Sequence, residues 1–331
     1  MLNKVLFVTE HYCDMNPAHG ETNTISILIE PFRDLKFANE VATFYYDDIA
    51  KKAGYSNLDM ALIKLCNDYK PDLIFFSPMG IPPEPSKEAL NSLHSPLTKI
   101  AMIRWDSISY AGDIFNRSWF PYLDYEIFMD STIGNLKYTN NKQAIQGVSS
   151  FNGKYFYDRK LVKDIDVCFV GWVGRDQNRG EYINFLRTHS INIHVAGGQR
   201  TNRISWDEYA TIISRSKISL NFSEHFQIKN RVFETLACRT MLLEEAGIQT
   251  NKFFDEGKDF VAFNNKEDML KKVVYYLSHD KEREKIANSG YLKNCLYNSK
   301  NIYAFILNWM GYDVAGDEHY AELCKKFGEL R

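Results

Sequence analysis

Short apolar runs alternate along the chain with longer segments in which apolar residues recur every three or four positions. The runs predict buried β-strands, and the periodic segments predict amphipathic helices. Strands are expected at residues 4–10, 40–48, 72–78, 99–106, 125–131, 166–172, 191–198, 218–224, 240–245 and 259–263. Helices are expected at residues 24–37, 58–70, 85–94, 179–189, 205–217, 230–239, 266–280, 281–298 and 299–312, with a further one near 317–329. This alternation predicts an α/β fold, with parallel sheets covered by helices on both faces.

A polar stretch at residues 134–164, rich in Asn, Gln, Gly and Lys, interrupts the alternation and is the predicted linker. The 331 residues agree with two domains of roughly 100–200 residues each. We therefore predict two doubly wound, Rossmann-like domains at residues 1–150 and 151–312, followed by a helical tail at residues 313–331.

The composition is that of an ordinary globular protein, with 45% hydrophobic and 25% charged residues. A formal net charge of −2 provides no global field toward nucleic acid or anionic membranes. The six cysteines form no CxxC pair and several lie in apolar runs, so we expect reduced thiols in a cytoplasmic protein. No signal peptide is expected, and no apolar run approaches the roughly 20 residues of an integral membrane segment.

Ligands of doubly wound sheets bind beyond the carboxyl ends of the strands, so the polar residues at those ends are candidates for a site. In the first half these residues are Glu10, His11, Asp47, Asp48, Ser77 and Asp106. In the second half they are Gly171 to Arg175, Gly197, Gly198, Glu224, His225, Glu244 and Glu245.

The stretch IKNRVFETLACRTMLLEE, residues 228–245, places Lys229 and Arg231 at the start of a predicted helix. Cations there oppose the positive end of the helix dipole. A bound anion would compensate both, and a diphosphate fits because Arg grips it bidentately while Lys acts as a point charge. Glu234, one turn further, could then accept hydrogen bonds from a ribose. The alternative is an exposed Arg231–Glu234 pair worth a few tenths of a kcal/mol.

Other candidates have structural alternatives of the same kind. Gly171 and Arg175 lie in a glycine-rich turn between a strand and a helix, which would bring backbone N–H groups toward a phosphate or would simply connect the two elements. Asp106 could be a general base on an acceptor hydroxyl or a helix cap. His11 could also be a base, since its ordinary pKa is about 6.5.

No metal site is expected. The sequence Asp164-Ile165-Asp166 has the letters of a DxD metal motif, but it precedes an apolar strand instead of following one, so we interpret it as a solvated turn. No His/Cys group has zinc spacing, and no phosphate loop of the GxxxxGK[ST] type is present.

The segment KNRVFETLACRTMLLEE, followed by FFDEGKDFVAFNNKEDMLKKVVYYL and REKIANSGY, resembles the donor half of GT-B glycosyltransferases. It is most similar to the spore-maturation-protein (CgeB-like) group, and the strands DVCFVGW and ISLNFSE also resemble that group. The resemblance covers roughly residues 165–295. It implies two facing Rossmann-like domains, an acceptor site in the first, a nucleotide diphosphate sugar as donor in the second, and no need for a metal or another cofactor.

The resemblance also implies roles for single residues. Arg231 and Lys229 would hold the diphosphate, Glu234 would bind the ribose, and Glu244 is the acidic residue that follows the apolar strand. Two positions depart from the pattern. Arg239 replaces a family Gly, and Phe226 occupies the place of a sugar-contacting acid of the related retaining enzymes, for which Glu224 is the nearest substitute.

These observations predict a cytoplasmic hexosyl- or pentosyltransferase that moves a sugar from a nucleotide diphosphate sugar to an acceptor hydroxyl. The likeness to retaining relatives suggests retention, whereas inversion would make an acid such as Asp106 the base. The alternatives are a nucleotide-sugar epimerase of the same fold and a non-catalytic nucleotide-sugar-binding protein. The sequence leaves the acceptor open among a glycan, a protein, a lipid-linked sugar and a modified nucleobase.

Overall fold

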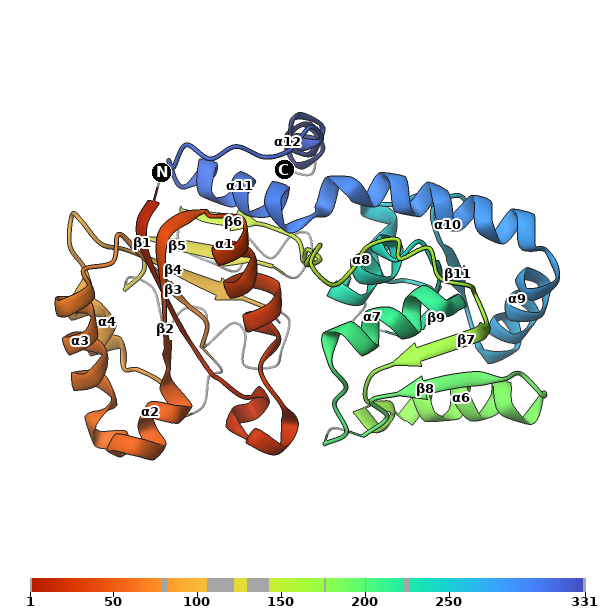
Figure 1. Cartoon of the computed structure of the whole chain (residues 1–331), viewed down its shortest axis with the longest axis horizontal. Coiled ribbons are helices and arrows are strands. Elements are labelled where there is room, and N and C mark those ends of the chain that lie inside the picture. The colour runs from red at the N-terminus through yellow and green to blue at the C-terminus, as the bar shows by residue number, and fades with distance from the viewer. Residues whose placement is uncertain are drawn as a thin grey trace. The chain divides into compact units, whose positions relative to one another are not determined.

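The computed structural model describes residues 2–78, 82–105, 122–129, 143–175, 177–199, 201–222 and 227–329. The chain forms two compact units (Figure 1). Residues 1–148 and 299–331 make up the first, here called the N-terminal unit, and residues 149–298 make up the second, the C-terminal unit.

The N-terminal unit contains a six-stranded sheet in which every strand is parallel to its neighbours. Its strands are β1 (Leu2–Thr9), β2 (Ala38–Tyr45), β3 (Leu73–Phe76), β4 (Lys99–Arg104), β5 (Tyr125–Phe128) and β6 (Ala144–Gln146). Their order is β2-β1-β3-β4-β5-β6. The strand order therefore reverses direction between β1 and β3, which is the switch point where doubly wound sheets bind ligands.

Helices pack on both faces of this sheet because successive side chains of a strand point to opposite sides. On one face, Leu6 and Val8 of β1 pack with residues of α2 (Tyr46–Ala53), α3 (Leu58–Tyr69) and α4 (Lys87–Leu93). On the other face, Phe7 contacts Phe32, which lies in α1 (Glu30–Asp34). The helix expected at residues 24–37 begins as a π-helical segment at Ile25–Ile29 and continues as α1, whose Pro31 lacks the N–H of a regular helix.

Two predictions for the N-terminal unit were wrong in their details. The strand expected at residues 40–48 ends at Tyr45, and α2 begins at Tyr46, so Asp47 and Asp48 occupy the first turn of a helix. Carboxylates in that position are stabilised by the helix dipole. The predicted linker contains β6, which pairs with β5 at the edge of the sheet. Its three residues are too few to give a periodic signal.

The C-terminal unit has a five-stranded parallel sheet in the order β11-β10-β9-β7-β8. Its strands are β7 (Ile165–Val170), β8 (Ile193–Ala196), β9 (Ser216–Asn221), β10 (Met241–Glu245) and β11 (Val261–Phe263). Its helices are α6 (Gln177–Thr188), α7 (Trp206–Arg215), α8 (Asn230–Ala237), α9 (Lys266–Ser278) and α10 (Asp280–Asn294). The switch point of this sheet lies between β7 and β9.

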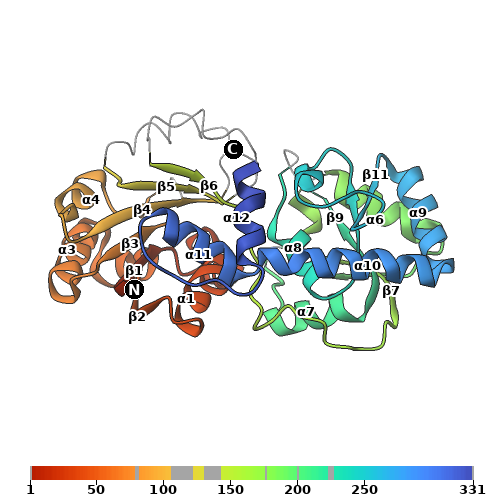
Figure 2. The same ribbon diagram turned by 90° about the horizontal axis from the view of Figure 1, so that it is seen from above.

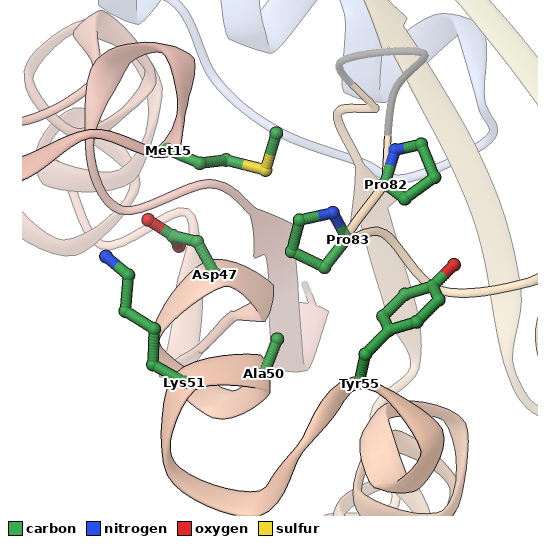
Figure 3. A pocket seen from close by; sticks show the side chains of 7 residues that line it. All are labelled: Met15, Asp47, Ala50, Lys51, Tyr55, Pro82 and Pro83. Atoms are coloured by element: carbon green, nitrogen blue, oxygen red, sulfur yellow. The ribbon is translucent and has the colours of Figure 1, made fainter.

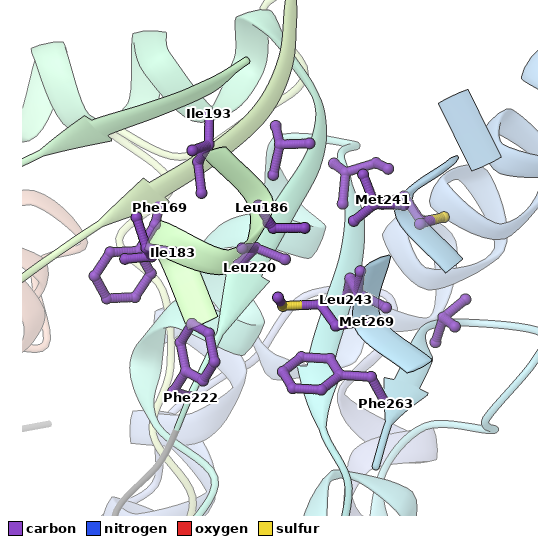
Figure 4. Close-up of a cluster of buried hydrophobic side chains, with 14 of the residues drawn as sticks. Phe169, Ile183, Leu186, Ile193, Leu220, Phe222, Met241, Leu243, Phe263 and Met269 are labelled. Carbon is purple, nitrogen blue, oxygen red and sulfur yellow. The ribbon is translucent and has the colours of Figure 1, made fainter. Parts of the chain in front are cut away.

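The core of the C-terminal unit also follows the strand alternation. Val167 and Phe169 of β7 belong to one cluster, which includes residues of α6, α9 and α10 (Figure 4). Cys168 and Val170 belong to a second cluster with residues of α7 and α8. Side-chain caps define helix starts where the sequence predicts them: the Ser205 hydroxyl accepts a hydrogen bond from Glu208 N at 3.1 Å.

The last helices belong to the N-terminal unit. In α11 (Ser299–Trp309), the Tyr303 hydroxyl donates a 2.5 Å hydrogen bond to the carbonyl of Ile27. α12 (Tyr320–Glu329) packs on α11 (Figure 2). Phe327 of α12 stacks on Phe305 of α11 with ring centres 4.7 Å apart. The compact units thus divide the chain at residues 148/149 and 298/299, whereas the sequence analysis places the domain boundaries at 150 and 312.

The two parallel, helix-covered sheets confirm the predicted fold class of two doubly wound Rossmann-like domains. In the described part of the chain, no helix is both long and apolar enough to cross a membrane. All six cysteines have free thiols.

Candidate functional site

The switch point of the C-terminal unit brings together several of the predicted site residues. Gly171 follows β7, Asn221 ends β9, and Arg231 lies in the first turn of α8. Glu244 lies opposite Asn221 on the neighbouring strand β10. The sequence predicted Gly171, Arg231 and Glu244 as site residues, and the sheet topology places them around one edge.

The guanidinium of Arg231 lies directly on Gly171. A Cβ atom at position 171 would be 2.5 Å from Arg231 Nη2, and the φ of Gly171 is +143°, a region that side chains rarely adopt. The guanidinium carbon is 5.1 Å from the centre of the Phe169 ring, and Nη1 donates to Asn221 Oδ1 at 3.4 Å. Glycine is therefore required at position 171 both for the turn and for the close approach of Arg231.

The start of α8 has the properties of an anion site. Its N-cap residue, Lys229, makes no side-chain cap, so the first backbone N–H groups receive no side-chain acceptor from it. Arg231 Nε is buried and has no hydrogen-bond partner among the described residues. The ammonium of Lys229 donates to Gln227 Oε1, and the amide of Asn230 donates to the Ser150 carbonyl at 3.0 Å. Two cations and a helix dipole thus lie together at this edge of the sheet.

Glu244 is a buried carboxyl with one free oxygen. Its side chain is 1% exposed, and Oε1 accepts a 2.5 Å hydrogen bond from the amide of Asn221. Its Oε2 atom has no partner among the described residues. Burial raises the pKa of Glu244 to about 7 because the charged form loses its hydration. Asn221 consequently links Glu244 to Arg231.

Glu234 lies inside the unit and not on an open surface. It is 3% exposed, and Oε2 accepts a 2.7 Å hydrogen bond from the Tyr209 hydroxyl. Burial raises its pKa to about 7, against the opposing effects of the Tyr209 hydrogen bond and the Arg231 charge. The exposed Arg231–Glu234 pair that the sequence left open is therefore absent, and the ribose contact of Glu234 stays a prediction.

The predicted site residues also include Arg175, Asp106 and Glu224. Arg175 ends a short 3-10 helix, Val173–Arg175, after the glycine-rich turn. Asp106 and Glu224, together with His225 and Phe226, lie outside the described residues, so their predicted roles stay predictions. No group of three or more His, Cys, Asp or Glu that could hold a metal ion occurs in the described ranges.

In the N-terminal unit, the candidate base His11 follows β1 and is held by α2. Its Nδ1 is 2.6 Å from Asp48 Oδ2, and its backbone N–H donates to Asp47 Oδ1 at 2.7 Å. Its ring stacks on Tyr45 at 4.4 Å with an interplanar angle of 14°. An acceptor at Nδ1 selects the tautomer that carries the proton there and leaves Nε2 as the basic nitrogen.

Sequence reasoning missed Asn221, Tyr209 and the role of Asp48. Asn221 ends an apolar strand in ISLN, which was a usable signal because strand ends carry sites. Asp48 was noted as polar but not paired with His11, since residues 37 positions apart meet only through strand pairing. Tyr209 is one of two aromatic residues on α7, and no sequence signal distinguishes it.

Comparisons with known proteins bear on the family and the fold of this chain. Residues 179–307, which include α8 and the end of β9, match the model of a family described as glycosyl transferase-like. No curated protein matches the chain in sequence. Solved structures with the same fold include HepE of Anabaena in complex with UDP and glucose (10% identity, 93% of this chain and 99% of that chain covered, TM-score 0.64).

Two further solved structures share the fold. The match to sucrose-phosphate synthase from Thermosynechococcus elongatus covers 98% of this chain and 99% of that chain, with 9% identity and a TM-score of 0.62. The match to a UDP-N-acetylglucosamine 2-epimerase covers 94% of this chain and 98% of that chain, with 10% identity and a TM-score of 0.54. The chain thus has the fold of the GT-B glycosyltransferases, with a glycosyl transferase-like sequence match across residues 179–307, most of which belong to its C-terminal unit.

Proposed function

We propose that the protein is a glycosyltransferase that moves a sugar from a nucleotide diphosphate sugar to an acceptor hydroxyl. The observation that carries this proposal is the position of Arg231, whose guanidinium lies on Gly171 at the switch point of the C-terminal sheet, beside the start of α8. The glycosyl transferase-like match over residues 179–307 supports the same reaction. The similarity to the CgeB-like group, carried by residues 228–245, stays a prediction within this proposal.

The leaving group of such a transfer is a nucleoside diphosphate, whose developing charge must be stabilised. Arg231 offers an unpartnered buried N–H, Lys229 adds a second cation, and α8 adds the positive end of its dipole. We therefore propose metal-independent transfer, in which these groups hold the diphosphate. HepE, which shares the fold, is crystallised with UDP and with UDP-glucose, which supports a uridine nucleotide as the first donor to test.

The acceptor hydroxyl must lose a proton during transfer, and His11 is the candidate base. Because Asp48 accepts at Nδ1, Nε2 is the nitrogen that would accept that proton, and it lies 3.7 Å from Oε1 of Glu21. This arrangement supports a base-assisted, inverting displacement. Retention, which the resemblance to retaining relatives suggests, remains the alternative, and Asp106 remains a second candidate base. The anomeric configuration of the product, read by proton NMR, distinguishes the two outcomes.

The first experiment is a thermal-shift series in the presence of EDTA, with nucleoside diphosphates and then their sugars. We expect one nucleoside diphosphate to raise the melting temperature without metal. If none does, the donor site is wrong; if the shift requires a divalent cation, metal independence is wrong. His11→Ala should then reduce the turnover of donor and acceptor by about 100-fold or more, with donor affinity unchanged.

An epimerase of the same fold is the second candidate, since the fold is shared with a UDP-N-acetylglucosamine 2-epimerase. Incubation with the donor alone distinguishes the two functions. An epimerase converts the sugar of the donor without any acceptor, whereas a transferase gives at most slow hydrolysis. A non-catalytic nucleotide-sugar-binding protein would show the thermal shift and no turnover with any acceptor.

A further inference from the structure

The N-terminal unit has a cavity of about 390 Å³ on its edge strand β2, lined by Arg33, Lys36, Ala38, Asn39 and Val41. Arg33 lies in α1, and Lys36 lies between α1 and β2. Both cations therefore adjoin the amino end of β2, whereas doubly wound sheets bind their ligands beyond the carboxyl ends of the strands. This cavity is thus separate from the acceptor site that the resemblance implies for the same unit.

A different cavity of the N-terminal unit lies near the carboxyl ends of the strands (Figure 3). It is lined by Met15, Asp47, Ala50, Lys51, Tyr55, Pro82 and Pro83. The one cation of this lining, Lys51, shares the cavity with the carboxylate of Asp47, so opposite charges offset each other there. The cavity on β2 differs, because its described lining has two cations and no carboxylate.

Arg33 and Lys36 are exposed, and neither has an ion-pair partner in the described part of the chain. The one carboxylate on β2, that of Glu40, pairs with Lys4 at 3.7 Å. Its side chain lies on the opposite face of the sheet from the side chain of Val41, because successive residues of a strand alternate. The two cations are therefore free to bind an anionic group from outside the chain.

β2 also has an open edge. In the described part of the chain it pairs with β1 and with no other strand. The carbonyl of Lys4 accepts a 2.9 Å hydrogen bond from the N–H of Asp72, so Lys4 and every second residue of β1 turn their backbone groups toward β3. Val5 and Phe7, which alternate with them, turn theirs toward β2.

The register of this pair decides which residues of β2 face outward. Val5 lies opposite Val41, and Phe7 lies opposite Thr43. In a parallel pair, a residue bonds to the two neighbours of the residue opposite it, so β1 uses the backbone groups of the even-numbered residues of β2. The N–H and C=O groups of Asn39, Val41 and Thr43 therefore point away from the sheet, and two of these three residues line the cavity.

The cavity lies on the face of the sheet that α1 covers. Phe7 contacts Phe32 of α1 on that face, and Val41 is opposite the residue two positions before Phe7, so its side chain points to the same side. A further strand paired to the open edge would place every second side chain on this face. Those side chains would lie over the cavity, next to Arg33 and Lys36.

The charges of the cavity select among occupants of the edge. Carboxylates at every second position of an added strand would meet Arg33 and Lys36, and the positions between them would lie beside Ala42, which packs against the core on the other face. A second copy of this chain, joined β2 to β2 about a twofold axis perpendicular to the sheet, would bring the odd-numbered residues of 39–45 to this face, and none of them is acidic. A small anion would use the cations and leave the backbone edge unpaired.

We propose that β2 and this cavity form a docking site for an extended segment of a partner protein in which acidic and apolar residues alternate. The segment adds to the six-stranded sheet as a further edge strand. Its backbone pairs with Asn39, Val41 and Thr43, and its carboxylates bind Arg33 and Lys36. This docking site goes beyond the proposed transferase reaction and does not depend on it.

The test is fluorescence anisotropy of the full-length protein with a labelled peptide of 8 residues, the length of β2, in which Glu alternates with Val. We expect saturable binding of this alternating peptide. A grouped peptide of the same composition, with all Glu before all Val, should bind about tenfold more weakly or worse, because it cannot place its carboxylates on one face. The alternating peptide with every second amide N-methylated should also lose binding, since it cannot pair with the edge.

Two double variants test the cations. Arg33→Gln/Lys36→Gln should bind the alternating peptide about tenfold more weakly or worse. The matched control is Lys52→Gln/Lys64→Gln, which removes two exposed lysines of α2 and α3 that do not line the cavity. This control should bind as the wild type does, and urea unfolding of both double variants checks that they are folded.

Amide hydrogen exchange of residues 38–45, measured by mass spectrometry, locates the bound peptide. Exchange there should slow with the alternating peptide and not with the grouped one, because only an added strand protects the outward N–H groups. The thermal shift with nucleoside diphosphates should be the same in both double variants and the wild type, so a failure of the donor site and a failure of this docking site are seen separately.

Four results overturn the inference. The first is that the wild type does not bind the alternating peptide. The second is that the grouped peptide binds equally well, which would indicate attraction between net charges. The third is unchanged exchange of residues 38–45 together with full competition by inorganic phosphate, which would indicate a small-anion site. The fourth is a dimer in which residues 38–45 are already protected without peptide, which would indicate a second copy on the edge.

Discussion

Replacement of Arg231 by Ala should weaken the binding of a nucleoside diphosphate by about 1.5–3 kcal/mol, the range for hydrogen bonds to charged groups. This free energy corresponds to a roughly 10- to 150-fold increase in Kd. The structure supports a value in this range because the guanidinium is half-buried on Gly171 and its Nε has no partner among the described residues. A phosphate would therefore gain a donor, Nε, that no described residue uses.

The same substitution should leave the chain folded. In the part of the chain that the structure describes, Arg231 has no ion-pair partner, so its removal leaves no carboxylate without its partner. The protein loses the contact with the Phe169 ring, worth about 0.5–2 kcal/mol, and a long hydrogen bond of 3.4 Å to Asn221. Arg231 also lowers the pKa of Glu234, so that carboxyl becomes neutral more readily in the variant.

A matched control lies at the other end of the same helix. Arg239 follows α8, pairs with Asp158 at 3.2 Å, and is largely exposed. Arg239→Ala removes the same charge from the chain at the cost of a surface ion pair worth about 0–1 kcal/mol. Nucleoside diphosphate affinity should therefore be unchanged in this variant.

The assay is isothermal titration calorimetry at one fixed ionic strength and at pH 8, above the pKa of about 7 of Glu234. The ligand is the nucleoside diphosphate with the largest thermal shift, and urea unfolding of each variant confirms that it is folded. A Kd of Arg231→Ala within twofold of the wild type refutes the phosphate assignment. An equal loss in Arg239→Ala would show that the effect comes from net charge and not from the site.

Two further predictions concern stability. Glu244 has a pKa of about 7 in the folded protein, against an ordinary value of about 4.3. The folded protein therefore binds a proton at this carboxyl more readily than the unfolded chain does, and this proton binding stabilises the folded state. The stabilisation is lost as the pH rises from about 4.3 to about 7. Glu244→Gln lacks this titrating carboxyl. Its free energy of unfolding in urea should therefore rise relative to that of the wild type by about 1.4 kcal/mol per pH unit across that window. A difference between the two proteins that does not change with pH contradicts the raised pKa of Glu244. At Gly290 a Cβ would overlap the carbonyl oxygen of Asp259 and approach Leu236 Cδ2 to 2.7 Å, so Gly290→Ala should lower the free energy of unfolding by about 1–3 kcal/mol. Gly153→Ala is its control, since a Cβ there meets nothing within 4 Å, and similar urea midpoints for the two variants would contradict the close approach.

Local hydrophobic patterns were sufficient to find most elements of this fold. The apolar runs of β1, β3, β7 and β9 are short and bounded by polar residues, which is the signal of a buried strand. The pattern did not find α2, because the strand signal of residues 40–48 continued over its first turn. It also did not find β6, whose stability comes from pairing with β5 and not from its own sequence.

Some features of the candidate site were likewise predictable from local sequence, and others required the tertiary structure. Arg231 and Gly171 were identifiable because charge at a helix start and glycine after a strand are local features. Their contact with each other, and the link through Asn221 to Glu244, required the parallel pairing of β7, β9 and β10. The burial of Glu234 against Tyr209 could not be predicted, because it depends on how α7 packs on α8.

The sequence by itself therefore determined the strands, the helices, the α/β class and the cations that point to a phosphate, since each depends on residues close together along the chain. Only the tertiary structure decided that α11 and α12 join the N-terminal unit and that Asp48 holds His11. These features depend on contacts between residues tens to hundreds of positions apart, such as Tyr303 with Ile27, and no local pattern encodes which distant segments will pack together.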